Sequence, residues 1–224
     1  MRWTLLSALF VVASCGQERM LPAASAHTVP GAPETASEEV GGVRVSADGD
    51  DWEARPSDLP DRLTPVKVRI INHSGAPAVI EYERFKLVGS HGRTYQALPL
   101  LPAEQATSLR RLGTIDPVYA ASNFFVAPRY HGVYPTLSPW AQPLARDDSS
   151  FGERYRLWDD GLPTRSMERM GLPEGVLADG GEISGFLYFE DATKHESRLT
   201  FHADIDDVKT GDQLADIAIP FRVR

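Results

Sequence analysis

Hydrophobic and polar residues alternate one by one in several short stretches of this chain. The pattern is clearest in residues 66–70 (VKVRI), 199–205 (LTFHADI) and 215–223 (ADIAIPFRV). A period of two places the apolar side chains on one face of a β-strand and the polar side chains on the other. Turn sequences such as NHSG (72–75) and SHG (90–92) lie between such stretches. We therefore expect an all-β fold of short antiparallel strands arranged as a sandwich.

The last of these stretches contains Pro220. Proline has no backbone N–H to donate to a neighbouring strand. We therefore expect this strand to lie at a sheet edge, or to direct the nitrogen of Pro220 away from its neighbour.

The alternation stops between residues 99 and 182, and we interpret this part as a long, partly helical insertion. Residues 102–113, 149–158 and 164–170 have the spacing and end signals of short helices. In the third of these, Thr164 is the expected N-cap.

Aromatic residues are frequent in the insertion, and three of them are candidates for ligand binding. Tyr130, Tyr134 and Trp140 lie close to prolines, and their rings would suit a groove for a glycan or an extended peptide. The alternative is that these rings cover the open face of a sheet and form a second core, and we favour this alternative.

The beginning of the chain has a different character. Arg2 precedes an apolar run over 5–12, which is shorter than the roughly 18 to 20 residues of a membrane-spanning helix. The run ends in Val-Ala-Ser-Cys at 12–15, and Cys15 is the only cysteine. This order resembles the lipobox of bacterial lipoproteins.

The lipobox resemblance implies that a signal peptide, residues 1–14, is removed and that Cys15 carries a diacylglyceryl group, with a further acyl chain such as palmitate. Such a protein is extracytoplasmic and lipid-anchored. Gly16 resembles the pattern of lipoproteins sent to the outer membrane if the envelope is Gram-negative. In other envelopes, the outer face of the cell membrane is implied.

The residues after Cys15 are small and polar, with little that can be buried. We interpret residues 15–41 as the lipidated cysteine and a flexible tether, which would span roughly 25–30 Å. Residues 42–224 then form a single β-sandwich domain with the insertion at 99–182.

A second resemblance concerns the strands at the end of the chain. Gly185–Phe189 (GFLYF), Thr210–Asp212 (TGD) and Ile219–Phe221 (IPF) are similar to the closing strands of immunoglobulin-like domains in uncharacterised bacterial lipoproteins. The resemblance implies an immunoglobulin-like antiparallel sandwich and no particular activity.

The charge of the chain limits its partners. The formal net charge is −8, which argues against nucleic acid and predicts repulsion from anionic lipid headgroups. The expected partners are the membrane, through the N-terminal lipid, and an envelope protein, glycan or peptide.

Motifs of catalysis are missing from the sequence. It contains no Gly-x-Ser-x-Gly, Ser-x-x-Lys, Walker or dinucleotide motif. Ser90 and His91 are neighbours, but a hairpin turn explains them better than a catalytic triad. An envelope hydrolase that uses Glu153, Asp159 or Asp160 of the insertion stays open as an alternative.

Calcium is the one metal that the sequence suggests, and no other cofactor is expected. Asp48, Asp50 and Asp51 supply hard oxygen ligands at a turn, without the spacing of an EF-hand. A second acidic group consists of Asp204, Asp206, Asp207 and Asp212. The alternative is that both groups are solvated turns, and we favour it. The leading hypothesis is a lipid-anchored, non-enzymatic binding or structural module of the cell envelope.

Overall fold

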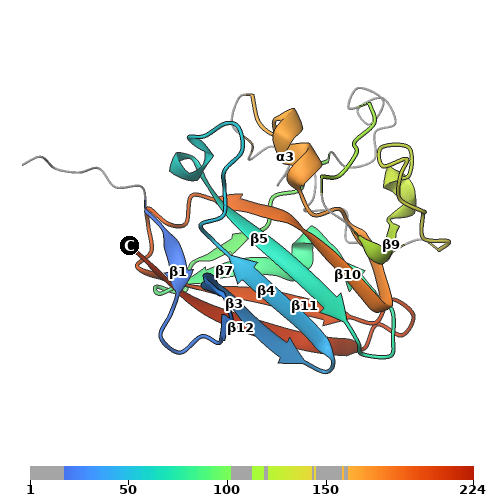
Figure 1. Ribbon diagram of the computed structural model, residues 1–224, viewed down its shortest axis with the longest axis horizontal. Coiled ribbons are helices and arrows are strands. Elements are labelled where there is room, and N and C mark those ends of the chain that lie inside the picture. The colour runs from blue at the N-terminus through green and yellow to red at the C-terminus, as the bar shows by residue number, and fades with distance from the viewer. Residues whose placement is uncertain (1–17, 102–112, 119–120, 143, 145–157, 159–160) are drawn as a thin grey trace, which may run out of the picture.

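A computed structural model describes residues 18–101, 113–118, 121–142, 144, 158 and 161–224. Two antiparallel sheets pack against each other as a sandwich (Figure 1). The first sheet has five strands, in the order β1 (Met20–Pro22), β12 (Gln213–Val223), β11 (Arg198–Asp206), β7 (Phe85–Gly89) and β8 (Thr94–Gln96).

The second sheet has seven strands. Its order is β2 (Thr28–Val29), β3 (Ala32–Val40), β4 (Val43–Asp48), β5 (Leu63–Asn72), β10 (Gly175–Glu190) and β6 (Ala78–Ile80), and β9 (Ser122–Val126) also pairs with β10. The described helical segments are η1 (Leu59–Asp61), η2 (Tyr82–Arg84), η3 (Pro128–Tyr130) and α3 (Arg165–Met170). The prediction of an all-β sandwich is confirmed at this level.

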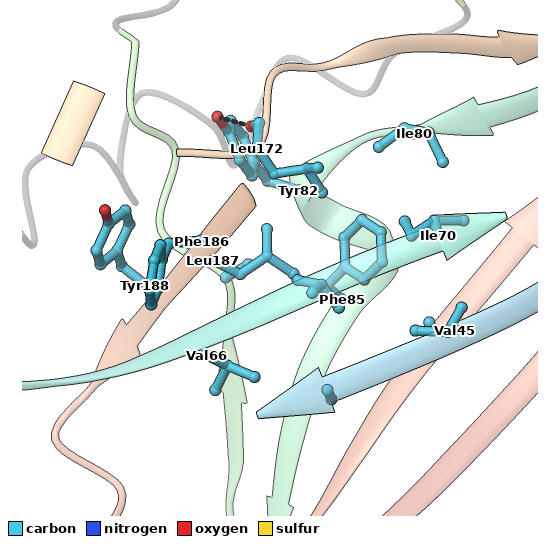
Figure 2. Packing of buried hydrophobic residues seen from close by; sticks show 14 of the residues in the cluster. Val45, Val66, Ile70, Ile80, Tyr82, Phe85, Leu172, Phe186, Leu187 and Tyr188 are labelled. Atoms are coloured by element: carbon cyan, nitrogen blue, oxygen red, sulfur yellow. Dashed lines mark hydrogen bonds between the residues drawn. The ribbon is translucent and has the colours of Figure 1, made fainter. Parts of the chain in front are cut away.

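The alternating stretches form strands with the expected faces. In β5, Val66, Val68 and Ile70 are buried, whereas Lys67 and Arg69 are exposed. β11 and β12 show the same alternation. Figure 2 shows side chains of both sheets pointing into a shared interior. Burial of these apolar faces drives the two sheets together.

The strand that contains Pro220 is not at a sheet edge, because β1 pairs with residues 221–223. The carbonyl oxygen of Pro220 accepts a hydrogen bond from the amide of Ala23. The N and O atoms of one strand residue point to the same side, so the nitrogen of Pro220 points away from β11 and past the end of β1. Of the two expectations, the one in which the nitrogen of Pro220 is directed away from the neighbouring strand is therefore correct.

The prediction of a flexible tether over 15–41 is wrong for residues 18–41. Met20 is fully buried, and β1 pairs with β12 in the five-stranded sheet. β3 pairs with β4 over six residues of each strand, from Thr35↔Asp48 to Val40↔Val43. Hydrogen bonding to strands elsewhere in the chain orders this segment, although its composition contributes little apolar surface. Residues 1–17 lie outside the described residues.

The insertion contains both helix and strand. Thr164 caps α3 as expected, since its hydroxyl accepts a hydrogen bond from the amide of Met167. β9 pairs with the first residues of β10, which begins at Gly175, so the second boundary of the insertion lies before 175 and not at 182. Residues 102–112, and nearly all of 149–158, lie outside the described residues.

The insertion and the connection between β4 and β5 cover part of the outer face of the seven-stranded sheet with a second apolar layer. Phe186 and Tyr188 lie on that face, because Phe186 pairs with outward-pointing Lys67 of β5. Trp52 contacts both rings edge-on, and Trp158 contacts Tyr188. Among the described residues, no helix is long and apolar enough to span a membrane.

Candidate functional site

A cleft of about 310 Å³ lies on the outer face of the seven-stranded sheet, where the second apolar layer ends. The outward-pointing residues of four strands line it. They are Thr35 of β3, Ser46 and Asp48 of β4, Lys67 and Arg69 of β5, and Glu182 and Ser184 of β10. This volume lies at the lower end of the roughly 300–1,000 Å³ that is usual for small-molecule sites.

Small side chains form the floor of the cleft. Arg69 pairs with Ser46 on one side and with Ser184 on the other, so its side chain is flanked by two serines. Neighbouring strands are about 4.8 Å apart, so the four strands from β3 to β10 give the cleft a width of about 14 Å. Hydroxyl groups of serine can both donate and accept hydrogen bonds there.

Two ion pairs lie above this floor. Lys67 Nζ lies 2.6 Å from the Asp51 carboxylate, and Arg69 donates two hydrogen bonds, of 2.7 and 2.8 Å, to Glu182. The hydrogen bonds from Arg69 lower the pKa of Glu182 in spite of its partial burial. The four side chains are between 40% and 54% exposed. Exposed pairs of this kind contribute only about 0–1 kcal/mol to stability, so a ligand can compete for them.

Asp48 supplies a third carboxylate to the cleft. It accepts hydrogen bonds from the Thr35 hydroxyl at 2.8 Å and from the Asp50 amide at 2.9 Å. Burial raises the pKa of Asp48 most, and the nearby negative charge of Asp51 adds to the rise. The cleft thus contains three carboxylates and two cations, which gives it a small negative charge.

A smaller hollow of about 170 Å³ adjoins the cleft and shares Asp51, Lys67 and Ser184 with it. Its other lining residues include Val118, Met170 and Phe186. Val118 is 55% exposed, although it is a large hydrophobic residue. The two hollows together form a depression that is polar over β4 and β5 and apolar beside α3.

The three aspartates proposed for calcium do not converge on a common point. Asp50 forms an ion pair with Arg19, Asp51 pairs with Lys67, and Asp48 is hydrogen-bonded as described above. In the second acidic group, Asp204 pairs with Lys86 and Asp206 with Arg84. The described part of the chain contains no group of three or more His, Cys, Asp or Glu side chains that could hold a metal ion.

Two of the three aromatic candidates belong to the core. Tyr130 is 1% exposed and Tyr134 is 0% exposed, so neither ring can line a groove. Trp140 is partly buried and contacts Phe125 edge-on. The alternative of a second core is therefore correct for Tyr130 and Tyr134.

The structure places Glu196 beside Ser90 and His91, but the connectivity is not that of a catalytic triad. Ser90 Oγ donates to Glu196 at 2.9 Å, and the same carboxylate oxygen lies 3.2 Å from His91 Nδ1. A triad needs the serine and the acid on different ring nitrogens. Burial raises the pKa of Glu196, but the hydrogen bonds from Ser90 and His91 outweigh it and lower the pKa.

The cluster at Glu196 instead closes the hairpin between β7 and β8. Tyr95 of β8 also points its hydroxyl at Glu196, at 3.4 Å. Gly89 at the end of β7 makes room, since a Cβ atom there would overlap the Glu196 carboxyl group. A structural role thus accounts for Ser90 and His91.

A buried group of charges joins η2, η3 and the start of β10. Arg129 lies 3.2 Å from Glu174 and 4.0 Å from Glu81, and both carboxylates are almost fully buried. Oε1 of Glu81 has no hydrogen-bond partner among the described residues. Burial, and then the charge of Glu174, raise the pKa of Glu81 to about 7.

The cleft was not predicted as a site, although its outward-pointing charges are visible in the sequence. Lys67 and Arg69 were predicted to point outward from one strand, but the strands that would lie beside them were unknown. Cys15, Glu153, Asp159 and Asp160 lie outside the described residues. Comparisons with models of protein families, with curated proteins and with solved structures gave no match.

Proposed function

We propose that this protein is a lipid-anchored, non-enzymatic binding module of the cell envelope, and that its ligand lies in the cleft over β4, β5 and β10. One observation carries this proposal. Two exposed ion pairs, Lys67–Asp51 and Arg69–Glu182, lie above a cleft floor that contains serines. The Val-Ala-Ser-Cys sequence at 12–15 supports the anchor, which makes the module extracytoplasmic.

The chemistry of the cleft supports a neutral or cationic ligand with many hydrogen-bonding groups. Carboxylates and guanidinium groups form paired hydrogen bonds with geometric specificity, and serines supply further donors and acceptors. Three carboxylates against two cations disfavour a polyanion. A glycan or an extended peptide has the required chemistry.

We also propose that the sandwich is immunoglobulin-like. In such domains one sheet has the strand order A-B-E-D and the other contains G-F-C. The orders β4-β5-β10-β9 and β12-β11-β7 correspond to these if β5 is strand B and β11 is strand F. The strands β1 to β3 are then additions at the edges.

Site-specific photo-crosslinking in intact envelopes tests the ligand site. A benzophenone amino acid at Ser184, on the floor of the cleft, should give a discrete adduct. The same amino acid at Thr200 is the control, since Thr200 is half-buried on the outer face of the other sheet. The double variant Lys67→Ala/Arg69→Ala should lose the Ser184 adduct.

Two results would contradict the binding proposal. One is the same set of adducts from Ser184 and from Thr200, and the other is an adduct that persists without Lys67 and Arg69. The anchor is tested separately by Cys15→Ser, which should abolish labelling with a palmitate analogue and release the protein from membranes. Normal membrane retention of that variant would refute the anchor.

A further inference from the structure

We propose that Arg198, Arg222 and Arg224 form a docking surface for anionic lipid headgroups, which holds the domain on the membrane next to its lipid anchor and turns the cleft away from it. This inference rests on the lipidation of Cys15 in the proposed function. The partner is a membrane surface, and contact with it gives the domain an orientation.

The three arginines lie on one face of the five-stranded sheet. Arg198 of β11 is directly opposite Arg222 of β12, and Arg224 lies two residues beyond Arg222, so alternation puts it on the same face. The backbone of Arg224 exchanges two hydrogen bonds with Arg19, which extends the pairing of β1 and β12 to this point. Leu199 and Phe221 are buried, so the neighbouring Arg198 and Arg222 belong to the outer face.

Among the described residues, no carboxylate forms an ion pair with these three guanidinium groups; Glu34, which lines the same hollow as Arg222, pairs with Arg19 instead. Nε of Arg222 is buried without a hydrogen-bond partner. Like charges that lie directly opposite each other on neighbouring strands are destabilising. An anionic partner that binds these three cations would relieve this repulsion. Other cations of this chain have a carboxylate partner on a neighbouring strand. Asp204 of β11, for example, forms an ion pair with Lys86 of β7.

The surface lies close to the anchor. Arg19 is already paired with Arg224, so only residues 16–18 separate the lipidated cysteine from the paired backbone. From Cys15 to Arg19 a fully extended chain spans at most about 14 Å. The anchor therefore brings the three arginines close to the headgroups, and the long tether expected from the sequence would not have done so.

Charge is distributed unevenly along this face. Asp204 and Asp216 lie opposite each other on β11 and β12, about 20 Å from Arg198 along the strand, and Lys86 offsets only the charge of Asp204. The net charge of −8 predicts repulsion from anionic lipid, but its distribution gives this sheet a basic end and an acidic end. The basic end is the one next to the anchor.

The orientation has a consequence for the ligand site. The cleft lies on the outer face of the seven-stranded sheet, and the arginines lie on the outer face of the five-stranded sheet. The two outer faces of a sandwich point in opposite directions, so contact through the arginines leaves the cleft open to an envelope partner.

Vesicle co-sedimentation of the full-length chain with Cys15→Ser tests the docking surface. The variant Arg198→Gln/Arg222→Gln/Arg224→Gln is compared with the control Arg44→Gln/Arg169→Gln/Lys209→Gln, which removes the same charge from exposed positions elsewhere. Both variants contain the apolar run at 5–12, so its contribution to vesicle binding is the same in both and does not affect the comparison. The vesicles contain phosphatidylcholine alone or with 30 mol% phosphatidylglycerol, a composition chosen as roughly that of an anionic surface.

The proposal predicts a weaker affinity of the first variant for phosphatidylglycerol vesicles, by roughly fivefold for each arginine, and no difference on phosphatidylcholine. The difference should shrink as salt is added, because salt screens these charges. Equal affinity of the two variants for phosphatidylglycerol vesicles would overturn it. Palmitate labelling and the Ser184 adduct report on the proposed function independently of this result.

Discussion

Replacing Glu81 by glutamine should change how the stability of this protein depends on pH. In the folded protein, burial and the neighbouring Glu174 raise the pKa of Glu81 from 4.5 to about 7. The folded state therefore holds a proton that the unfolded state releases between pH 4.5 and 7. Stability from this group is fully present below pH 4.5 and is lost as the pH rises to 7.

The magnitude follows from the size of the shift. One pKa unit corresponds to about 1.4 kcal/mol, so the free energy of unfolding of the wild type should fall by about 3 kcal/mol across this window because of Glu81. Glutamine at this position resembles the protonated acid and cannot ionise. We expect Glu81→Gln to match the wild type near pH 4.5 and to exceed it by about 3 kcal/mol at pH 8.

Urea denaturation at several pH values between 4.5 and 8 measures this difference. Glu53→Gln is the matched control, because Glu53 is exposed, and its curve should run parallel to that of the wild type. A Glu81→Gln curve that also runs parallel to the wild type, or a variant that loses stability relative to the wild type as the pH rises, would show that Glu81 does not cause this pH dependence.

Three further substitutions test other parts of the structure. Met20→Ala should destabilise the protein by about 2–5 kcal/mol, because Met20 is fully buried; a urea midpoint no lower than that of Glu18→Ala would mean that this segment is not part of the domain. Gly89→Ala should lower the free energy of unfolding by about 1–3 kcal/mol, since its Cβ would overlap the buried carboxyl group of Glu196. Gly132→Ala is the control, because a Cβ atom there meets open space, and it should lower the thermal midpoint less. Arg69→Ala should change the unfolding free energy by less than about 1 kcal/mol, because its ion pair is exposed, while reducing photo-crosslinking from the cleft; unchanged crosslinking would remove Arg69 from the site.

The strands that alternate in sequence were predictable because their periodicity is a local property. Val66, Val68 and Ile70 point inward whatever strand lies beside them, and the same holds for the inward residues of β11 and β12. The cap of α3 at Thr164 was predictable for the same reason, since the hydroxyl and the amide that it binds are three residues apart.

The segment from 18 to 41 was not predictable in this way. Its strands are held by hydrogen bonds to residues far along the chain, as in the pairing of Met20 with Val223. Composition measures how much apolar surface a segment can bury, but not whether a distant strand edge is free to pair with it. The expectation of a tether failed for this reason.

Local periodicity alone sets which side chains point outward from each strand, and it requires two apolar faces to meet. Which outward residues become neighbours depends on how the strands assemble. The assembly places Ser46 and Ser184 beside Arg69, three arginines at one end of a sheet, and two buried carboxylates around Arg129. Burial depends on the period along one strand, whereas a cleft or a charged surface depends on the register between strands that lie far apart in the chain.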